Sequence, residues 1–264
     1  MKLVKPSIKL IKQGETVDDI YKHIEYAGRV CYASEPKEGS AKEFVDRLIK
    51  SGHGSVLEHG TVYLFVFNNE FSITSTCGNK YGRNPYSTIN TDDNGNLYIT
   101  TNMRVLVEND WLDDLVNYGC KPTEYHDKRI TVEVNCDIGI SREANRHRAF
   151  SISEQSTRYC NFSKDKFNNE VTFIEPCWNL DNFAGDLFKL ALRDSEIKYL
   201  QLIESGWKPQ QARNVLPLAT ATRVIYTAYE KDWKHFFDLR CHSNAHPQAQ
   251  EIANMIKYKI HGIN

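Results

Sequence analysis

The sequence predicts a single-domain α/β (α+β) protein, and three observations support this. Apolar residues recur at helical spacing, β-branched and aromatic runs lie between the helical segments, and an Asn-Gly pair separates two strand-like runs. The chain has 264 residues, of which 41% are hydrophobic and 25% are charged. This length is enough for one large domain with a well-buried core. We therefore expect one domain over residues 1–264.

The N-terminal part predicts two helices and a strand. In "ETVDDIYKHIEYAGRVCYAS", apolar residues recur every three or four positions from Val17 to Ala27, and Thr16 is a suitable N-cap. "SAKEFVDRLIKSGHGS" has the same helical character and is stopped by Gly52 and Gly54. "GTVYLFVF" is typical of a buried strand.

Residues 76–128 differ in character from the segments around them. "NPYSTINTDDNGNLYITTNMRVLVEN" has an Asn-Gly turn flanked by strand-like runs, which predicts a hairpin. "DWLDDLVNYG" indicates a short helix ending at Gly119. Because this section is too short to bury a core of its own, we expect an insertion in the domain.

The remainder alternates strands and helices before a helical end. "RITVEVNCDIGI" predicts a strand, and Ser141 is expected to cap a helix over "SREANRHRAF". The strand "VTFIEP" and the long helix "FAGDLFKLALRDSEIKYLQLIESG" follow. "PQQARNVL" predicts a helix that begins at Pro209 and is closed by Pro217. The last forty residues or so are expected to be largely helical.

Charge and cysteine content argue against several classes of protein. The formal net charge is -1 and the pI is near 6.8, so a broad basic surface for a nucleic-acid polymer is not expected. No apolar run approaches the length of a signal peptide core or a membrane span. Seven cysteines without C-x-x-C spacing indicate neither a disulfide framework nor a zinc ribbon. We expect a cytoplasmic protein that is not bound to a membrane.

The segment "RHRAFSISEQSTRY" concentrates groups that bind anions. Arg146, Arg148 and Arg158 supply guanidinium groups, and the serines between them supply hydroxyls, which together suit a phosphorylated ligand. Glu154 in this segment either holds an arginine in place or accepts from a ribose hydroxyl. The alternative is a solvated helix end with surface ion pairs, and the residues alone leave both interpretations open.

Three further segments carry weaker signals. "HGSVLEH", from His53 to His59, does not follow the H-E-x-x-H order of zinc proteases, and capping or core hydrogen bonds suit both histidines. "LRCHSNAHPQAQ" has no second cluster to complete a zinc site, so no metal is expected. Arg213 in "QARNVLPLATATR" can face an anion. The sequence contains no phosphate-binding loop of the G-x-x-x-x-G-K-[ST] type.

Together these segments resemble the flavin-dependent thymidylate synthases. From Arg146 to Ser156 the residues match the R-H-R-x7-S signature of that family. "SGHGSVLEH", "ARNVLPL" and "LR" followed by "HPQ" are similar to its other sequence blocks, in the same order. The resemblance covers most of residues 15–80 and 129–260.

The resemblance implies an enzyme that reductively methylates dUMP to dTMP. Methylenetetrahydrofolate would supply the carbon, and tightly bound FAD reduced by NADPH would supply the hydride. It also implies a homotetramer with shared active sites, and a mixed, largely antiparallel sheet flanked by helices.

The resemblance assigns Arg240 as the catalytic residue, since a guanidinium beside the pyrimidine favours its N3-deprotonated form. The residues implied to bind substrate are Glu143, Ala144, Asn145, Arg146, Glu154, Gln155, Ser156, Thr157, Arg158, Arg213 and Arg240. Those implied to bind the flavin are His53, Ser55, Arg146, His147, Arg148, Glu154, Tyr229, Lys231 and His235.

The chain departs from the family pattern in places. Glu143 stands where a glutamine is often found, and Tyr229, Lys231 and His235 stand where some members have Asn, Arg and Asn. The "HSNAHPQAQ" segment has extra residues relative to some members, and the resemblance assigns no role to His246. We expect the hairpin of the insertion to lie at the tetramer surface or the entrance to the site.

Other functions compete with this one. A non-catalytic nucleotide- or RNA-binding module would use the same arginines together with Tyr159 and Phe162 for stacking, although the near-neutral charge argues against it. A related flavoprotein with another substrate is a second alternative. A histidine-centred metallohydrolase is a third.

Overall fold

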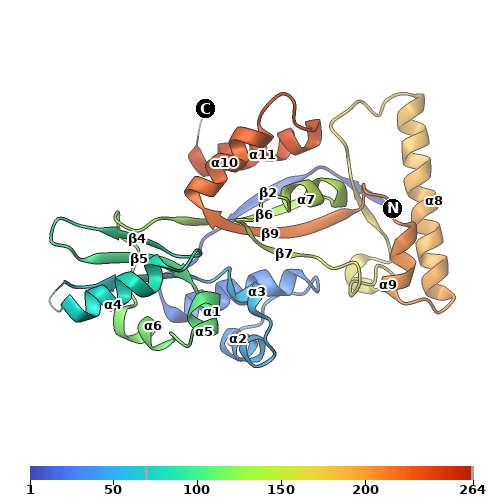
Figure 1. Cartoon of the computed structure of the whole chain (residues 1–264). Helices are drawn as coiled ribbons and strands as arrows, with labels where there is room; N and C mark the ends of the chain where they lie inside the picture. The colour runs from blue at the N-terminus through green and yellow to red at the C-terminus, as the bar shows by residue number, and fades with distance from the viewer. Residues whose placement is uncertain (69–70, 263–264) are drawn as a thin grey trace.

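A four-stranded antiparallel sheet forms the centre of the molecule (Figure 1). The computed structural model describes residues 1–68 and 71–262. The strand order is β2-β6-β9-β7, with bounds β2 Ser7–Ile11, β6 Arg129–Asp137, β9 Ala221–Tyr229 and β7 Ser151–Glu154. The two central strands pair along their whole length, from Arg129 opposite Tyr229 to Asp137 opposite Ala221.

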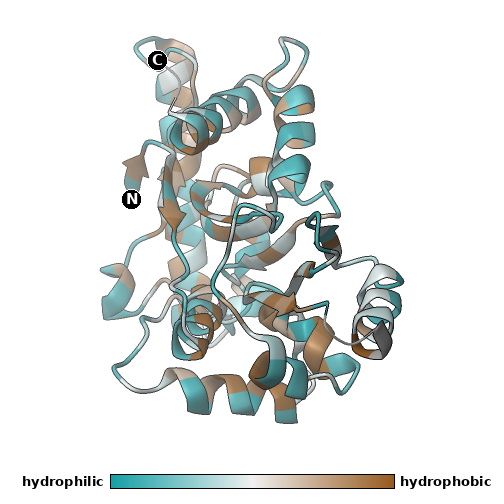
Figure 2. Ribbon diagram, turned by 90° about the vertical axis from the view of Figure 1, so that its left-hand side faces the viewer, coloured by the Kyte–Doolittle hydropathy of each residue, from teal (hydrophilic) through white to brown (hydrophobic). Residues whose placement is uncertain are grey.

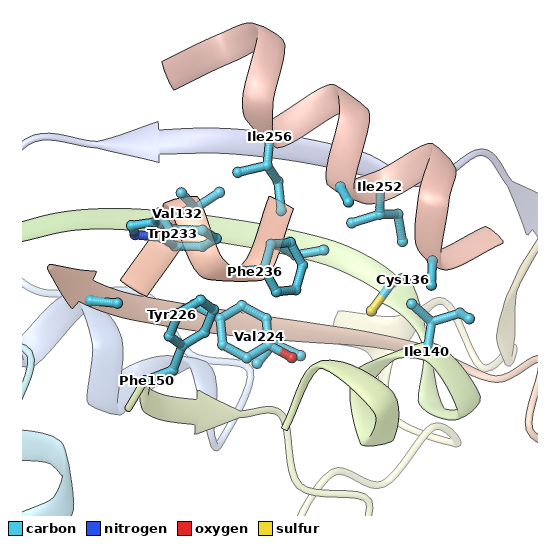
Figure 3. Close-up of a cluster of buried hydrophobic side chains, with 14 of the residues drawn as sticks. Val132, Cys136, Ile140, Phe150, Val224, Tyr226, Trp233, Phe236, Ile252 and Ile256 are labelled. Atoms are coloured by element: carbon cyan, nitrogen blue, oxygen red, sulfur yellow. The ribbon is translucent and has the colours of Figure 1, made fainter. Parts of the chain in front are cut away.

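Helices cover both faces of this sheet. On one face lie α7 (Ile138–Ala144), α10 (Glu230–Arg240) and α11 (Pro247–His261), and their apolar side chains pack on β6 and β9 (Figure 3). On the other face, Ala27 and Val30 of α1 (Val17–Val30) pack against Ile225. Figure 2 shows brown and teal stretches alternating along the helices, as expected where one helix face packs inward.

A three-stranded antiparallel sheet, β3-β5-β4, extends from one end of the central sheet. Its strands are β3 (Thr61–Val66), β5 (Leu97–Asn102) and β4 (Thr88–Thr91), and α4 (Phe71–Gly82), α5 (Met103–Glu108) and α6 (Asp113–Tyr118) pack around it. Gly95 of the Asn-Gly turn has φ +78°, a conformation that glycine adopts without strain. The predicted hairpin is confirmed, and it shares a core with β3 and α1.

The other end of the molecule holds a two-stranded parallel pair and a long helix. The pair consists of β1 (Lys2–Val4) and β8 (Thr172–Ile174), and the helix is α8 (Phe183–Glu204). The short helix α9 (Pro209–Ala212) packs against α8 (Figure 1). No helix in the described part of the chain is both long and apolar enough to cross a membrane.

Most predicted elements are confirmed, as is the fold class of a mixed, largely antiparallel α/β structure. Thr16 caps α1 with a capping box to Asp19. The helix α2 (Ala41–Lys50), the strands β3, β6 and β8, and the helices α6 and α8 lie where expected. Residues 263–264 of the predicted helical end lie outside the described residues.

Four predictions of local structure were wrong. Asp137, not Ser141, caps α7, because its carboxylate accepts from the N–H of Ile140 at 2.8 Å. The helix then ends at Ala144, so residues 145–150 form turns instead of a helix. Residues 103–108 form helix α5, capped by Asn102, instead of continuing a strand-like run. The helix predicted from Pro209 ends at Ala212 and continues only as a 3-10 turn over Arg213–Val215.

Candidate functional site

The carboxylate of Glu154, at the end of β7, is held by three side chains from α7, its C-cap and β9. One oxygen accepts from Ser141 Oγ at 2.7 Å and Thr222 Oγ1 at 3.1 Å, and the other accepts from Asn145 Nδ2 at 3.2 Å. Tyr226 donates to Asn145 Oδ1 at 2.9 Å and fixes the amide. Hydrogen bonds to a carboxylate are charge-assisted and strong. Glu154 therefore ties α7 and β9 to β7, and it bonds no arginine among the described residues.

A cavity of about 690 Å³ lies beside Glu154. Its wall includes the predicted substrate residues Glu154, Gln155, Ser156, Thr157 and Arg213, together with Ile138, Arg142, Asn214, Leu216, Pro217 and Leu218. Arg213 Nη1 donates to Thr157 Oγ1 at 3.3 Å, and the exposed guanidinium of Arg142 has no partner within the described chain. A cavity with guanidinium groups and hydroxyls on its wall suits a phosphate or another anion.

Arg158, also predicted to bind substrate, does not line this cavity. Its Nε donates to Gln210 Oε1 at 3.2 Å, and its guanidinium lies 5.3 Å from the ring centroid of Tyr159. In this chain Arg158 thus connects the loop after β7 to α9. Its substrate role remains a prediction.

Arg240, at the end of α10, is bound to the α7 region. Its Nε donates to His147 Nε2 at 3.1 Å, Nη1 donates to Glu143 Oε2 at 2.9 Å, and Nη2 donates to the backbone oxygen of Glu143 at 3.0 Å. Glu143, noted above as a departure from the family pattern, thus provides a salt bridge to Arg240. Because a guanidinium carries five N–H donors, Arg240 keeps donors available for a ligand.

His147 is neutral in the folded protein. Burial, with Arg240 and His235 nearby, lowers its pKa to about 4. Because Nε2 accepts from Arg240, the proton of the neutral ring resides on Nδ1. His147 can therefore donate one hydrogen bond from Nδ1 without carrying charge.

The predicted flavin residues come from three places in the chain. Arg146 and Arg148 are exposed in the turns after α7, and their guanidinium groups form no hydrogen bond or ion pair with the residues that the structure describes. At α10, Lys231 Nζ lies 5.3 Å from the ring centroid of Tyr229, and the rings of His235 and His147 are 6.1 Å apart. His53 and Ser55 are exposed at the short helix α3 (Gly54–Leu57), where Ser51 Oγ lies 2.7 Å from His53 Nδ1.

The expectation for His59 is confirmed. It is fully buried, its Nδ1 lies 2.8 Å from Thr227 Oγ1, and its Nε2 lies 3.0 Å from Ser153 Oγ. Burial, with His23 and Arg129 nearby, lowers its pKa well below the ordinary value. His59 is therefore a neutral core residue that fixes the "HGSVLEH" segment to β9 and β7.

Sequence reasoning missed several residues of the site. Ser141, predicted to be a helix cap, bonds Glu154 instead, and Thr222 lies on β9, a strand that the sequence pattern does not indicate. Arg142 and Asn214 line the cavity. Both are sequence neighbours of predicted residues, and the four-residue spacing of Arg142 and Arg146 was a usable signal. In the described part of the chain, no three His, Cys, Asp or Glu side chains are grouped to hold a metal ion.

The fold and the site define a member of a known family. The family model described as "Thymidylate synthase complementing protein" matches residues 13–77 and 80–263, and the chain belongs to this family. Its relatives carry the name flavin-dependent thymidylate synthase. One from Geobacter sulfurreducens is 32% identical over 129 residues, covering 47% of this chain and 54% of that protein.

Two other relatives with the same name differ in coverage. One from Pyrococcus furiosus is 31% identical over 119 residues, covering 45% of this chain and 48% of that protein. One from Mycobacteroides abscessus is 22% identical over 234 residues, covering 87% of this chain and 71% of that protein. The chain spans about half the length of the first two relatives.

Proposed function

We propose that the protein reductively methylates dUMP to dTMP, with methylenetetrahydrofolate as the carbon donor and FAD reduced by NADPH as the hydride source. Family membership and the names of the relatives support this proposal. The observation that carries it is the arrangement of the arginine- and serine-rich segment. Residues 154–157 line an anion-binding cavity, while Glu143 and His147 hold Arg240 at the neighbouring helix end.

The cavity beside Glu154 would bind the phosphate and sugar of dUMP. Arg213 and Arg142 supply positive charge on its wall, and Ser156 and Thr157 supply hydroxyl donors. The N–H of Ser156 donates to the backbone oxygen of Cys31 at 3.0 Å, which fixes the loop before any ligand arrives. Such preorganisation lowers the entropy lost on binding.

Arg240 would act on the pyrimidine. Uracil C5 is a weak nucleophile, and a guanidinium beside the ring stabilises the N3 anion, which raises the electron density at C5. The salt bridge to Glu143 and the hydrogen bond to His147 orient this guanidinium. Its side chain is 21% exposed, so ligand binding would remove most of the remaining water around the charge.

The residues present fit a flavin dinucleotide. The unpaired guanidiniums of Arg146 and Arg148 suit its two phosphates, and His147 offers a neutral N–H donor. His53, Ser55, Glu154, Tyr229, Lys231 and His235 complete the proposed set. When bound, the flavin supplies the hydride for the methylene group.

A homotetramer with shared active sites is part of this proposal. Arg240 does not line the cavity beside Glu154 within one chain, so a second copy would complete each site. Exposed apolar residues also recur along one face of α8, at Phe183, Leu187, Leu190 and Ile197. A stripe of this kind favours association. Leu187→Lys with Leu190→Glu should lower the mass measured by light scattering, and an unchanged mass would refute a role for α8.

A cytoplasmic location is also proposed. All seven cysteines are free, as is usual in a reducing compartment. Fractionation of the producing cells tests this.

The decisive experiment for the activity is an anaerobic assay with all four components. Purified protein with FAD, NADPH, methylenetetrahydrofolate and dUMP should yield dTMP, and omission of NADPH, methylenetetrahydrofolate or dUMP should abolish the product. Turnover of another substrate without dTMP formation would favour the related flavoprotein instead.

A further inference from the structure

Residues 76–128, the predicted insertion, contact the predicted flavin residues at two separate places. The first is α3, where α5 of the insertion packs on it. Arg104 Nη1 donates to Glu58 Oε1 at 2.5 Å, and Arg104 Nε donates to Glu108 Oε1 at 2.7 Å. A methyl group added at Gly54 would lie 3.0 Å from Glu108 Oε1 and 3.1 Å from Arg104 Nε. The Arg104–Glu108 pair thus packs directly on the backbone between His53 and Ser55.

The second place is Tyr229, at the end of β9. Its hydroxyl lies 2.9 Å from the backbone oxygen of Thr100 and 3.1 Å from that of Tyr86, so it donates into the insertion sheet. Burial raises the pKa of Tyr229 to about 12, which keeps the hydroxyl protonated at physiological pH. The loop before β4 is fixed as well, because Asn84 Oδ1 accepts from the N–H of Tyr86 at 2.9 Å.

Arg129 connects these two places. Its Nη1 donates to the backbone oxygen of Glu58 at 2.9 Å, and its guanidinium lies 5.6 Å from the ring centroid of Tyr229. Its Nη2 also donates to Ser151 Oγ at 3.1 Å, at the start of β7. The α3 segment, the end of β9 and the insertion are therefore parts of one contact network.

We propose that the insertion is a structural wall of the flavin site, with Arg104 as a positioning residue and the hydroxyl of the proposed flavin residue Tyr229 as the second anchor. This inference rests on the proposed flavin-dependent function. A helix of four residues such as α3 is too short to be stable through its own hydrogen bonds, so the placement of His53 and Ser55 depends on what packs against it. Lys231, over the ring of Tyr229, depends on the second anchor in the same way.

Tyr229→Phe and Arg104→Gln test the two anchors separately. Tyr229→Phe keeps the ring beside Arg129 and Lys231 and removes only the hydroxyl. FAD titration by quenching of flavin fluorescence should give a dissociation constant roughly tenfold higher for each variant, the effect of losing one or two buried hydrogen bonds. The absorption spectrum of the bound flavin should shift too, which a loss of stability alone would not cause.

Lys80→Met is the matched control within the insertion. Lys80 Nζ bonds Asp114 Oδ2 at 2.6 Å, between α4 and α6. This variant should lower the melting temperature and leave the FAD dissociation constant as in the unmodified protein.

Equal FAD affinity in Tyr229→Phe, Arg104→Gln and the unmodified protein would overturn the inference and leave the proposed function intact. A loss of affinity in Lys80→Met as large as in the other two would also overturn it, because general loosening would then explain the effect. Failure of the unmodified protein to bind FAD would overturn the proposed function and this inference with it.

Discussion

Replacing Glu154 by glutamine tests whether its carboxylate holds the site together. The carboxylate accepts from Ser141 and Thr222 on one oxygen and from Asn145 on the other. Glutamine keeps one oxygen for the hydroxyls but places an NH₂ group against Asn145 Nδ2, or requires both amides to turn. Asn145 cannot turn freely, because its Oδ1 accepts from Tyr226.

The expected cost follows from these contacts. One unsatisfied partly buried donor costs about 1–3 kcal/mol, and replacing charge-assisted bonds to the two hydroxyls by neutral ones adds about 1 kcal/mol. Glu154→Gln should therefore lower the free energy of unfolding by roughly 2–4 kcal/mol in urea denaturation. Glu43→Gln, which alters an exposed ion pair with Arg47 on α2, should leave the urea midpoint unchanged. A Glu154→Gln midpoint equal to that of the unmodified protein would refute the reasoning.

Three further predictions concern ligands and pH. Arg240→Ala should reduce turnover by at least about a hundredfold and keep FAD bound, because Arg240 is proposed to act on the pyrimidine; loss of flavin together with activity, in a flavin absorbance measurement, would contradict this. Arg146→Gln and Arg148→Gln should each weaken FAD binding about tenfold in fluorescence titration. The melting temperature should stay unchanged, since neither guanidinium has a partner in the described chain. A fall in melting temperature without a change in FAD affinity would indicate a structural role instead. Burial lowers the pKa of His23 to about 4, so as the pH falls His23 is protonated in the unfolded chain before it is protonated in the folded protein. The free energy of unfolding should therefore be level above about pH 7 and decrease from pH 6.5 towards pH 4, by up to about 3 kcal/mol from this residue. Urea denaturation across this pH range checks it, and a His23→Gln variant with the same slope would show that the loss arises elsewhere.

Local sequence signals located most of the helices and strands. Three of these signals depend only on residues that are close together in the sequence, and all three are confirmed. They are the N-cap of α1 at Thr16, the glycine stop at Gly52 and the Asn-Gly turn at residues 94–95. The error at α7 had a physical cause. Asp137 and Ser141 lie one turn apart, and both residue types are good helix caps. Asp137 caps the helix, whereas the hydroxyl of Ser141 donates to the carboxylate of Glu154 on β7.

The site was less predictable, because its contacts join distant parts of the chain. The motif segments identified Glu154, Ser156, Thr157 and Arg213, which line one cavity. Arg240 bonds Glu143 and His147, and Tyr229 bonds the backbone of Tyr86 and Thr100. Neither pairing leaves a periodicity or a spacing in the sequence, since each depends on how two elements pack. For the same reason the sequence does not show that α5 packs on α3.

The flavin spectrum of the purified protein tests the central claim most directly. The protein, supplemented with FAD and freed of unbound ligand, is recorded before and after anaerobic addition of NADPH with dUMP. The proposed function predicts an oxidised flavin spectrum that bleaches on reduction. A protein that stays colourless after incubation with FAD would contradict it and favour a non-catalytic nucleotide-binding role for the arginine-rich segment.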